Sequence, residues 1–374
     1  QTAVPNSLMF SKPLAMKSTY KRLGDYIEVV EARNRDLSVK LSQGICNLKY
    51  FQDPRQVAEN SVADKIVRRG WFAYNRATTR NGDKISIAYR DGQDCTVSAS
   101  YLTFKIKNEE SLNPYYLMMW FKRPEFDRYA RFKSHGSAHE YFEWEEMCDV
   151  MLPIPPIEEQ RKIVAEYQAI ERRIESNRRL IATLEATAQT IYRHMFVDNI
   201  DPENLPLGWR MGTIGELFTL QRGHDLPSQL RQNGVYPIYA STGINGFHNE
   251  YKVKSSCVVT GRSGSIGIVN YVNDDFWPLN TTLFVRDCAN SSMEYAYFKL
   301  IELELDKLVA GFAAVPTLNR NDVHMIETVI APKEHFVNFS NDVRSFFRSI
   351  NIINREVSLL NRLCDTLLSK LSKL

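Results

Sequence analysis

Two polar loops in the first half of the chain carry side chains that could hydrogen-bond to nucleic-acid bases. Their candidate residues are Asn75, Arg76, Thr78, Thr79 and Arg80 in one loop and Lys133, Ser134, His135 and Ser137 in the other. Arginine can donate two hydrogen bonds to guanine O6 and N7, asparagine can bond adenine N6 and N7, and threonine can bond phosphate oxygens. As groups these residues indicate contacts with double-stranded DNA, whereas any one of them alone is equally consistent with a solvated loop.

Four further polar segments in the second half of the chain offer the same chemistry. Their candidate residues are Arg222, then Ser241, Thr242 and Asn245, then Arg262 and Ser263, and finally Asn319 and Arg320. Arg262 and Ser263 lie in a glycine-rich segment, 261–267, which a strand-like run follows. The spacing of its glycines is not that of a dinucleotide-binding loop and no helix follows, so we expect a tight turn that exposes both side chains.

The chain lacks the motifs of an enzyme. It contains no phosphate-binding G-x-x-x-x-G-K-[ST] sequence. The segment 113–116 (N-P-Y-Y) resembles the N-P-P-Y of amino-methyltransferases only faintly, because the second proline is absent and no glycine-rich cofactor loop precedes it. His135 and His139 are four residues apart but have no third metal ligand nearby. The sequence therefore predicts no catalytic residues, no metal site and no cofactor bound by this chain.

Two long helices are predicted to position these loops. Apolar residues recur alternately four and three positions apart from Ile163 to Met195 and again from Phe339 to Leu371, each position of the second series lying 176 residues after one of the first. Such unbroken heptad series mark the seams of coiled coils. We expect the helices to pair as an antiparallel coiled coil, although each could instead seal its own domain or bind another chain. Asn177, a lone polar residue on the first seam, is expected to fix the register.

The segments that precede the two helices repeat a common order of elements. Both contain β-rich runs broken by polar turns, a Ser/Thr-aromatic segment and a short helix, at low sequence identity. The fold class is therefore predicted to be α+β, with two globular domains alternating with two long helices. The predicted boundaries are an irregular lead-in at 1–19, a first domain at 20–156, a first helix at 157–198, a second domain at 199–332 and a second helix at 333–374.

The composition excludes several classes of protein. No run of 18 or more apolar residues exists, so a membrane span is not expected, and six scattered cysteines without a C-x-x-C pair argue against zinc sites and disulfide frameworks. Since the first twenty residues lack an export pattern, we expect a cytoplasmic protein. The 47 Lys and Arg against 44 Asp and Glu give a net charge of only +3. Any DNA affinity must therefore come from local patches or be shared with a partner.

Three motifs give the chain a resemblance to the specificity subunits of Type I restriction-modification enzymes. They are an L-P-x-G-W opener at 205–209, a G-R-x-G-S-I-G strand turn at 261–267, and an L-P-I-P-P-x-E-E-Q-x-x-I junction into the first helix at 152–163. The resemblance covers essentially residues 20–374. The second junction, at 330–336, lacks the glutamine, and the first domain has the segment 74–82 in place of a clean G-R-x-G turn.

The resemblance implies that both domains are target-recognition domains, each of which reads one half of a split DNA site, and that the paired helices are a spacer. It also implies docking of two methylation subunits, which bring S-adenosylmethionine, and of restriction subunits, which bring translocation and cleavage that depend on ATP and Mg. The chain itself is then a non-catalytic recognition subunit. Two alternatives stay open, a coiled-coil scaffold or adaptor without a DNA role and a fused DNA methyltransferase or nuclease.

Overall fold

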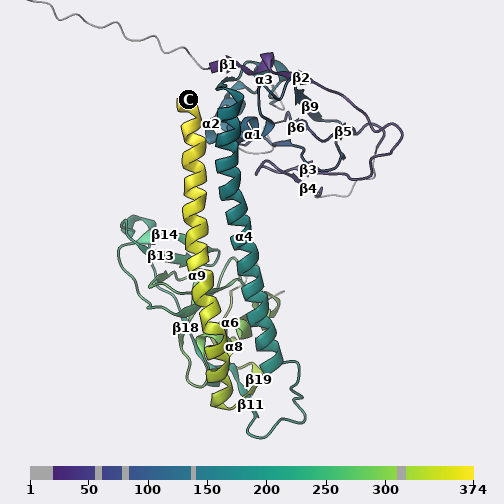
Figure 1. The fold of residues 1–374 in the computed structure, drawn as a ribbon. Coiled ribbons are helices and arrows are strands. Elements are labelled where there is room, and N and C mark those ends of the chain that lie inside the picture. The colour runs from purple at the N-terminus through teal and green to yellow at the C-terminus, as the bar shows by residue number, and fades with distance from the viewer. Residues whose placement is uncertain (1–19, 55–60, 78–83, 136–139, 310–316) are drawn as a thin grey trace, which may run out of the picture. The chain divides into compact units, whose positions relative to one another are not determined.

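The computed structural model of the chain describes residues 20–54, 61–77, 84–135, 140–309 and 317–374 (Figure 1). The chain divides into two compact units, one made of residues 1–174 and 359–374 and the other of residues 175–358. Each unit contains a mixed helix-and-sheet domain and a part of both long helices. The predicted α+β class, with two repeated domains and two long helices, is confirmed.

The first unit is built around a four-stranded antiparallel sheet with the strand order β2-β9-β6-β7. Its core is aromatic: Phe72 of β6 stacks on Phe104 of β9 with ring centroids 4.9 Å apart, and Phe121 of helix α1 meets both rings edge-on. The elements of the unit before the first long helix are β1 (Tyr20–Arg22), η1 (Leu23–Asp25), β2 (Ile27–Val29), β3 (Gly44–Ile45), β4 (Phe51–Gln52), β5 (Lys65–Val67), β6 (Trp71–Asn75), β7 (Ile87–Tyr89), β8 (Cys95–Val97), β9 (Tyr101–Ile106), α1 (Pro114–Lys122), α2 (Pro124–Lys133), α3 (Trp144–Cys148) and β10 (Met151–Pro153).

The second unit repeats this arrangement with a four-stranded antiparallel sheet in the order β12-β18-β15-β16. Helix α6 packs against its strands β15 and β16. The elements between the two long helices are β11 (Arg210–Thr213), α5 (Ile214–Leu217), β12 (Thr219–Arg222), η2 (Ser228–Leu230), β13 (Tyr236–Ala240), β14 (Gly243–His248), β15 (Cys257–Gly261), β16 (Val269–Val272), β17 (Trp277–Pro278), β18 (Thr282–Asp287), α6 (Met293–Glu302), α7 (Leu305–Leu308), α8 (Arg320–His324) and β19 (Glu327–Ile330). By strand order, β6 of the first sheet corresponds to β15 of the second.

A short two-stranded sheet closes each domain immediately before its long helix. In the first unit β1 pairs with β10, and in the second β11 pairs with β19, both antiparallel. Helix α4 (Ile157–Phe196) follows β10, helix α9 (Lys333–Lys370) follows β19, and the turn η3 (Leu371–Lys373) ends the chain. Proline precedes both helices, at Pro156 and Pro332, where the missing N–H costs no helical hydrogen bond.

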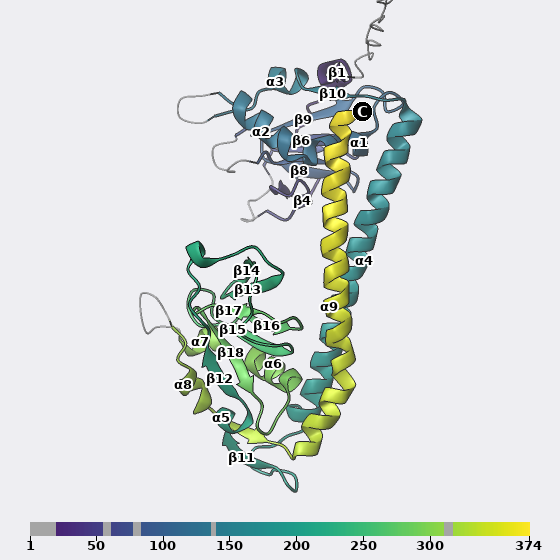
Figure 2. The same cartoon turned by 90° about the vertical axis from the view of Figure 1, so that its left-hand side faces the viewer.

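Within the second unit α4 and α9 lie side by side with opposite directions (Figure 1 and Figure 2). Phe196, the last residue of α4, stacks on Phe336 near the start of α9 with 5.3 Å between ring centroids. Tyr192, one turn earlier in α4, meets Phe339, one turn later in α9, at 6.0 Å. These rings belong to the core of the second domain, so this end of the helix pair is sealed by aromatic packing on the domain.

The glutamine of the first helix junction has a structural role. Gln160 is fully buried, its amide donates to the carbonyls of Ser111 and Pro155, and its oxygen accepts from the backbone N–H of Asn113. It therefore ties the loop before α1 to the first turn of α4. The residue 176 positions later is Phe336, which is buried in the aromatic cluster of the second unit, so the second junction uses packing in place of hydrogen bonds.

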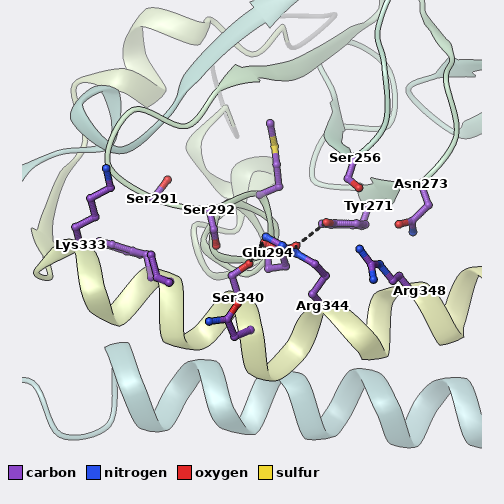
Figure 3. A pocket seen from close by; sticks show the side chains of 14 residues that line it. Ser256, Tyr271, Asn273, Ser291, Ser292, Glu294, Lys333, Ser340, Arg344 and Arg348 are labelled. Carbon is purple, nitrogen blue, oxygen red and sulfur yellow. Dashed lines mark hydrogen bonds and ion pairs between the residues drawn. The ribbon is translucent and has the colours of Figure 1, made fainter.

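A buried carboxylate joins helix α6 to helix α9 in the second unit (Figure 3). Glu294 is 3% exposed and accepts hydrogen bonds from Tyr271 at 2.9 Å and Ser340 at 2.8 Å, and Arg344 approaches it at 3.3 Å. Burial alone would raise the pKa of Glu294, but its hydrogen bonds and the charge of Arg344 outweigh burial, so the pKa lies below its usual value. The ionised form is therefore favoured in the folded state.

Glu294→Gln is expected to destabilise the chain at neutral pH by about 1–3 kcal/mol, because a buried charge-assisted network is lost. The carboxylate stabilises the fold above its unfolded pKa of about 4.3, and this contribution disappears as pH falls through the depressed folded pKa. The difference between wild type and variant in denaturant unfolding should thus shrink on acidification. The exposed Asp342→Asn on the same helix is the control, and an equal pH dependence in both variants would contradict this role for Glu294.

Candidate nucleic-acid interface

The candidate loops of the two domains follow corresponding strands. In the first unit β6 ends at Asn75 and Arg76 comes next; in the second unit β15 ends at Gly261 and Arg262 comes next. Because β6 and β15 hold the same place in sheets of the same order, Asn75 and Arg76 occupy in their domain the position that the G-R-x-G turn occupies in the other. The first domain therefore has an equivalent of that turn with a different sequence.

Backbone hydrogen bonds fix the turn around Arg262. Its N–H donates to the carbonyl of Thr281 at 2.8 Å, and its own carbonyl accepts from the N–H of Leu318 at 2.8 Å. The N–H of Ser263 also donates to Thr281. Since both sides of the Arg262 backbone are held, the side chain projects from a rigid position, and the segment with Asn319 and Arg320 is brought next to the turn.

Glycine is required in this turn because other chain segments approach closely. A Cβ atom on Gly261 would lie 1.9 Å from the carbonyl oxygen of Ser265, and one on Gly264 would lie 3.3 Å from the Ser241 hydroxyl. Gly223, which follows Arg222, donates its N–H to the carbonyl of Thr282. Thr282 lies in β18 and pairs with Gly261 of β15. The turn, the β13–β14 connection and the end of β12 thus meet at one end of the second sheet.

The structure brings together candidates that are about a hundred residues apart in the sequence. Arg222, Arg262 and Arg320 come from three different segments at this end of the sheet. Among the described residues, none forms an ion pair with any of these three side chains. Asn319 is exposed but engaged, since its side chain caps helix α8 by accepting from the N–H of Asn321. The three segments therefore place three arginines at this end of the sheet, called here the arginine edge, whose positive charge can attract phosphate or a base.

Two other candidates of the second domain, Ser241 and Asn245, are less free to contact a ligand. Ser241 is 9% exposed, which leaves little of its hydroxyl open to solvent. Asn245 is exposed on β14, but its side-chain oxygen accepts from Arg231 at 2.8 Å. Thr242, between them at the tip of the β13–β14 hairpin, is exposed. Of this segment, Thr242 is the residue best placed to reach a ligand.

Among the described residues of the first domain, the candidate cations Arg76 and Lys133 are held in ion pairs. Arg76 pairs with Glu143 at 3.0 Å and lies 5.8 Å from the ring centroid of Tyr141. Tyr141 forms backbone bridges with both Ala77 and His135, so the two polar loops predicted separately are joined in the structure. A ligand that uses Arg76 must compete with the carboxylate of Glu143.

The second loop of the first domain is only partly exposed. Lys133 pairs with Glu146 at 3.2 Å, and His135, which is exposed, lies 3.4 Å from the same carboxylate. Ser134 is buried, and its hydroxyl donates to the Ala130 carbonyl at 2.6 Å, so it closes the end of α2 and does not offer a free hydroxyl. The candidates Thr78, Thr79, Arg80 and Ser137 lie outside the described residues.

Two features were not predicted from the sequence. Lys49 and Asp127 form a buried pair at 2.5 Å in the first unit, where the Lys49 ammonium also donates to the Phe121 carbonyl. Burial lowers the pKa of Lys49, while Asp127 opposes this shift. The pair holds the loop before β4 on helix α2 and is a structural feature. The second is a set of large apolar side chains that the β13–β14 hairpin leaves exposed, including Ile244 and Phe247. Neither lies in a polar motif that a sequence pattern would single out.

The described part of the chain forms neither a metal-binding cluster nor a helix able to cross a membrane. In the ranges that the structure describes, no group of three or more His, Cys, Asp and Glu side chains is arranged to hold a metal ion. Within the same ranges, none of the helices combines the length and the apolar character that a membrane crossing requires.

Comparisons with known proteins identify relatives of both domains. Residues 59–186 and 206–323 match the family described as the Type I restriction modification DNA specificity domain. Over 292 residues the chain is 23% identical to the Type I restriction enzyme MjaIX specificity subunit of Methanocaldococcus jannaschii, a match that covers 68% of this chain and 67% of that protein.

Solved structures include a similar fold. The S subunit of a Type-I restriction-modification system from M. genitalium matches with a TM-score of 0.65 at 16% identity, covering 94% of this chain and 95% of that one. The HsdS subunit from Thermoanaerobacter tengcongensis matches with a TM-score of 0.37 at 19% identity, covering 94% and 96%. The first of these likenesses concerns the fold, which both chains share over nearly their whole lengths.

Proposed function

The chain belongs to the family of Type I restriction-modification specificity subunits, and from that premise we propose that it reads a split DNA site, one half with each domain, and has no catalytic role of its own. One observation carries the proposal. Arg222, Arg262 and Arg320 lie in segments that come together at one end of the second sheet, and among the described residues no carboxylate forms an ion pair with them. Arginine is the side chain that most often reads guanine in the major groove.

The charge balance supports a recognition role that is shared with partners. The net charge is only +3, and Arg76 and Lys133 of the first domain are held in ion pairs, so little uncompensated positive charge is available to phosphates. Because affinity for DNA grows with the number of phosphates neutralised, the chain alone is a weak binder. We therefore propose that methylation subunits, two per chain, supply additional phosphate contacts.

Docking of the methylation subunits is proposed for the surface of the helices. Leu359 and Leu363, one turn apart on α9 in the first unit, are 57% and 44% exposed. Exposed leucines at this spacing form an apolar strip on a helix that can pack against another helix. On this proposal S-adenosylmethionine is bound by the methylation subunits, and ATP and Mg by restriction subunits that join them.

The proposal is tested by measuring DNA affinity at several salt concentrations with and without methylation subunits. The isolated chain should bind weakly with a shallow dependence of log K on log[salt], and both affinity and slope should rise in the complex, since each added phosphate contact adds about 0.9 to the slope. Equal affinity and slope in both samples would contradict the shared interface. A complex that assembles but binds no DNA would favour a scaffold, and methyl transfer by the isolated chain would favour a methyltransferase.

A further inference from the structure

A groove of about 900 Å³ lies in the second unit between the β13–β14 hairpin and helix α9. Three large apolar side chains that line it are open to solvent: Val235 is 78% exposed, Ile244 56% and Phe247 55%. Single exposed apolar residues are common, but a cluster of them around one hollow is typical of a surface that binds another molecule. The groove thus has the apolar character of an interface.

Aromatic rings line the inner wall of this groove. Tyr271 stacks on Phe347 of α9 with 4.2 Å between ring centroids, and Tyr297 of α6 meets Phe347 edge-on at 5.3 Å. A tyrosine phenol is neutral at physiological pH, and burial raises the pKa of Tyr239 and Tyr297 further, to about 12. Neutral tyrosine rings attract cations to their faces, in addition to packing against apolar groups.

The charge of the groove is negative. Glu185, Asp274 and Asp275 line it, and the one cation among its lining residues, Arg355, is paired with Asp274. Carboxylates repel the phosphates of DNA, so the groove differs in kind from the arginine edge formed by Arg222, Arg262 and Arg320. A polypeptide with apolar side chains and at least one lysine or arginine complements both the rings and the carboxylates.

We propose that this groove receives a segment of a methylation subunit that carries an apolar anchor flanked by Lys or Arg. The inference rests on the proposed function, because it assumes that a methylation subunit docks on the chain. It goes further by giving the second recognition domain a protein-binding face that is separate from the arginine edge. Apolar contact at Phe247 supplies most of the affinity, and the carboxylates select the cationic segment.

The experiment measures assembly of the full chain with its methylation subunit by a titration at two salt concentrations. Phe247→Ala is expected to weaken assembly at least ten-fold, because truncation of a central aromatic anchor has effects of this size. Glu185→Gln is expected to weaken it about three-fold and to reduce its salt dependence, since one attractive charge is removed. Leu230→Ala is the matched control, because Leu230 is 63% exposed in the same unit but does not line the groove.

The outcomes separate this inference from the proposed function. If wild type does not assemble with the methylation subunit at all, the proposed function fails. If wild type assembles and Phe247→Ala assembles equally well, with unchanged thermal unfolding in both, the groove is not the docking site. If Phe247→Ala loses DNA binding in a fully assembled complex, the groove faces DNA and the inference is also overturned. Phe247→Trp, which keeps an aromatic anchor, should retain assembly.

Discussion

Arg262→Ala is expected to relax selection at one base position of one half-site and to leave the other positions unchanged. Both sides of the Arg262 backbone are hydrogen-bonded within the turn, so the substitution removes the guanidinium without moving the loop. A bidentate contact from arginine to guanine contributes about 1–3 kcal/mol of discrimination. Selection from randomised DNA with the assembled complex should show that loss as a single degenerate position.

Arg76→Ala should give the same kind of change at the other half-site, but a smaller one. In the free chain Arg76 is paired with Glu143. Breaking an exposed ion pair of this kind costs up to about 1 kcal/mol, so the net contribution of a base contact by Arg76 is smaller by that amount. Arg286→Ala is the control, since this exposed arginine is paired with Asp287 on β18.

Uniform weakening across all sequences would assign Arg262 to a phosphate contact, and unchanged selection would place its turn away from DNA.

The long helices were predictable because their signals are local. Heptad spacing and a proline before the first turn depend on a few neighbouring residues, and α4 and α9 begin at Ile157 and Lys333, directly after Pro156 and Pro332. Strand order was not predictable, because it depends on pairs such as β2 with β9 that are far apart in the sequence. Both segments repeat a common order of elements along the chain, and the structure adds that their two four-stranded sheets have corresponding strand orders.

The role of Asn177 stays a prediction. Its side chain is 3% exposed, and its amide nitrogen has no hydrogen-bond partner among the residues that the structure describes. A buried polar group without a hydrogen-bond partner lowers the free energy of unfolding by about 1–3 kcal/mol. A seam residue that lowers stability is expected where it excludes other registers of a helix pair.

The candidate DNA residues were predictable as groups and not one by one. Residue type identified the polar turns, but ion pairing and burial are properties of the folded chain. Sequence alone could not distinguish Arg76, which has a carboxylate partner, from Arg262, for which the described residues contain none. It could not show that Ser134 is buried at the end of α2, nor that Phe247 is exposed on a strand, where an apolar residue is normally taken for core.

Lengthening both helices by one heptad is expected to widen the unread gap between the two half-sites. Insertions of seven residues near Asn177 in α4 and near Ile353 in α9 keep both seams in phase. Each adds about 10 Å of helix at about 1.5 Å per residue, which corresponds to about three base pairs at roughly 3.4 Å each. Selection from randomised DNA should return the same bases in each half-site with a gap about three base pairs longer.

The change in gap length shows whether the two long helices set the spacing between the half-sites. Three extra base pairs also rotate one half-site by about a third of a helical turn, so affinity is expected to fall even when the bases read stay the same. Insertions of two residues in both helices are the control, because at 3.6 residues per turn they rotate the following apolar residues by about 200°, off the seam, and should lower the temperature of unfolding. A variant with seven residues added to α4 alone should fail to assemble with the methylation subunits, because the seam of α9 is then too short to pair with the lengthened seam of α4. Altered half-sites with an unaltered gap would mean that the domains, and not the helices, set the spacing.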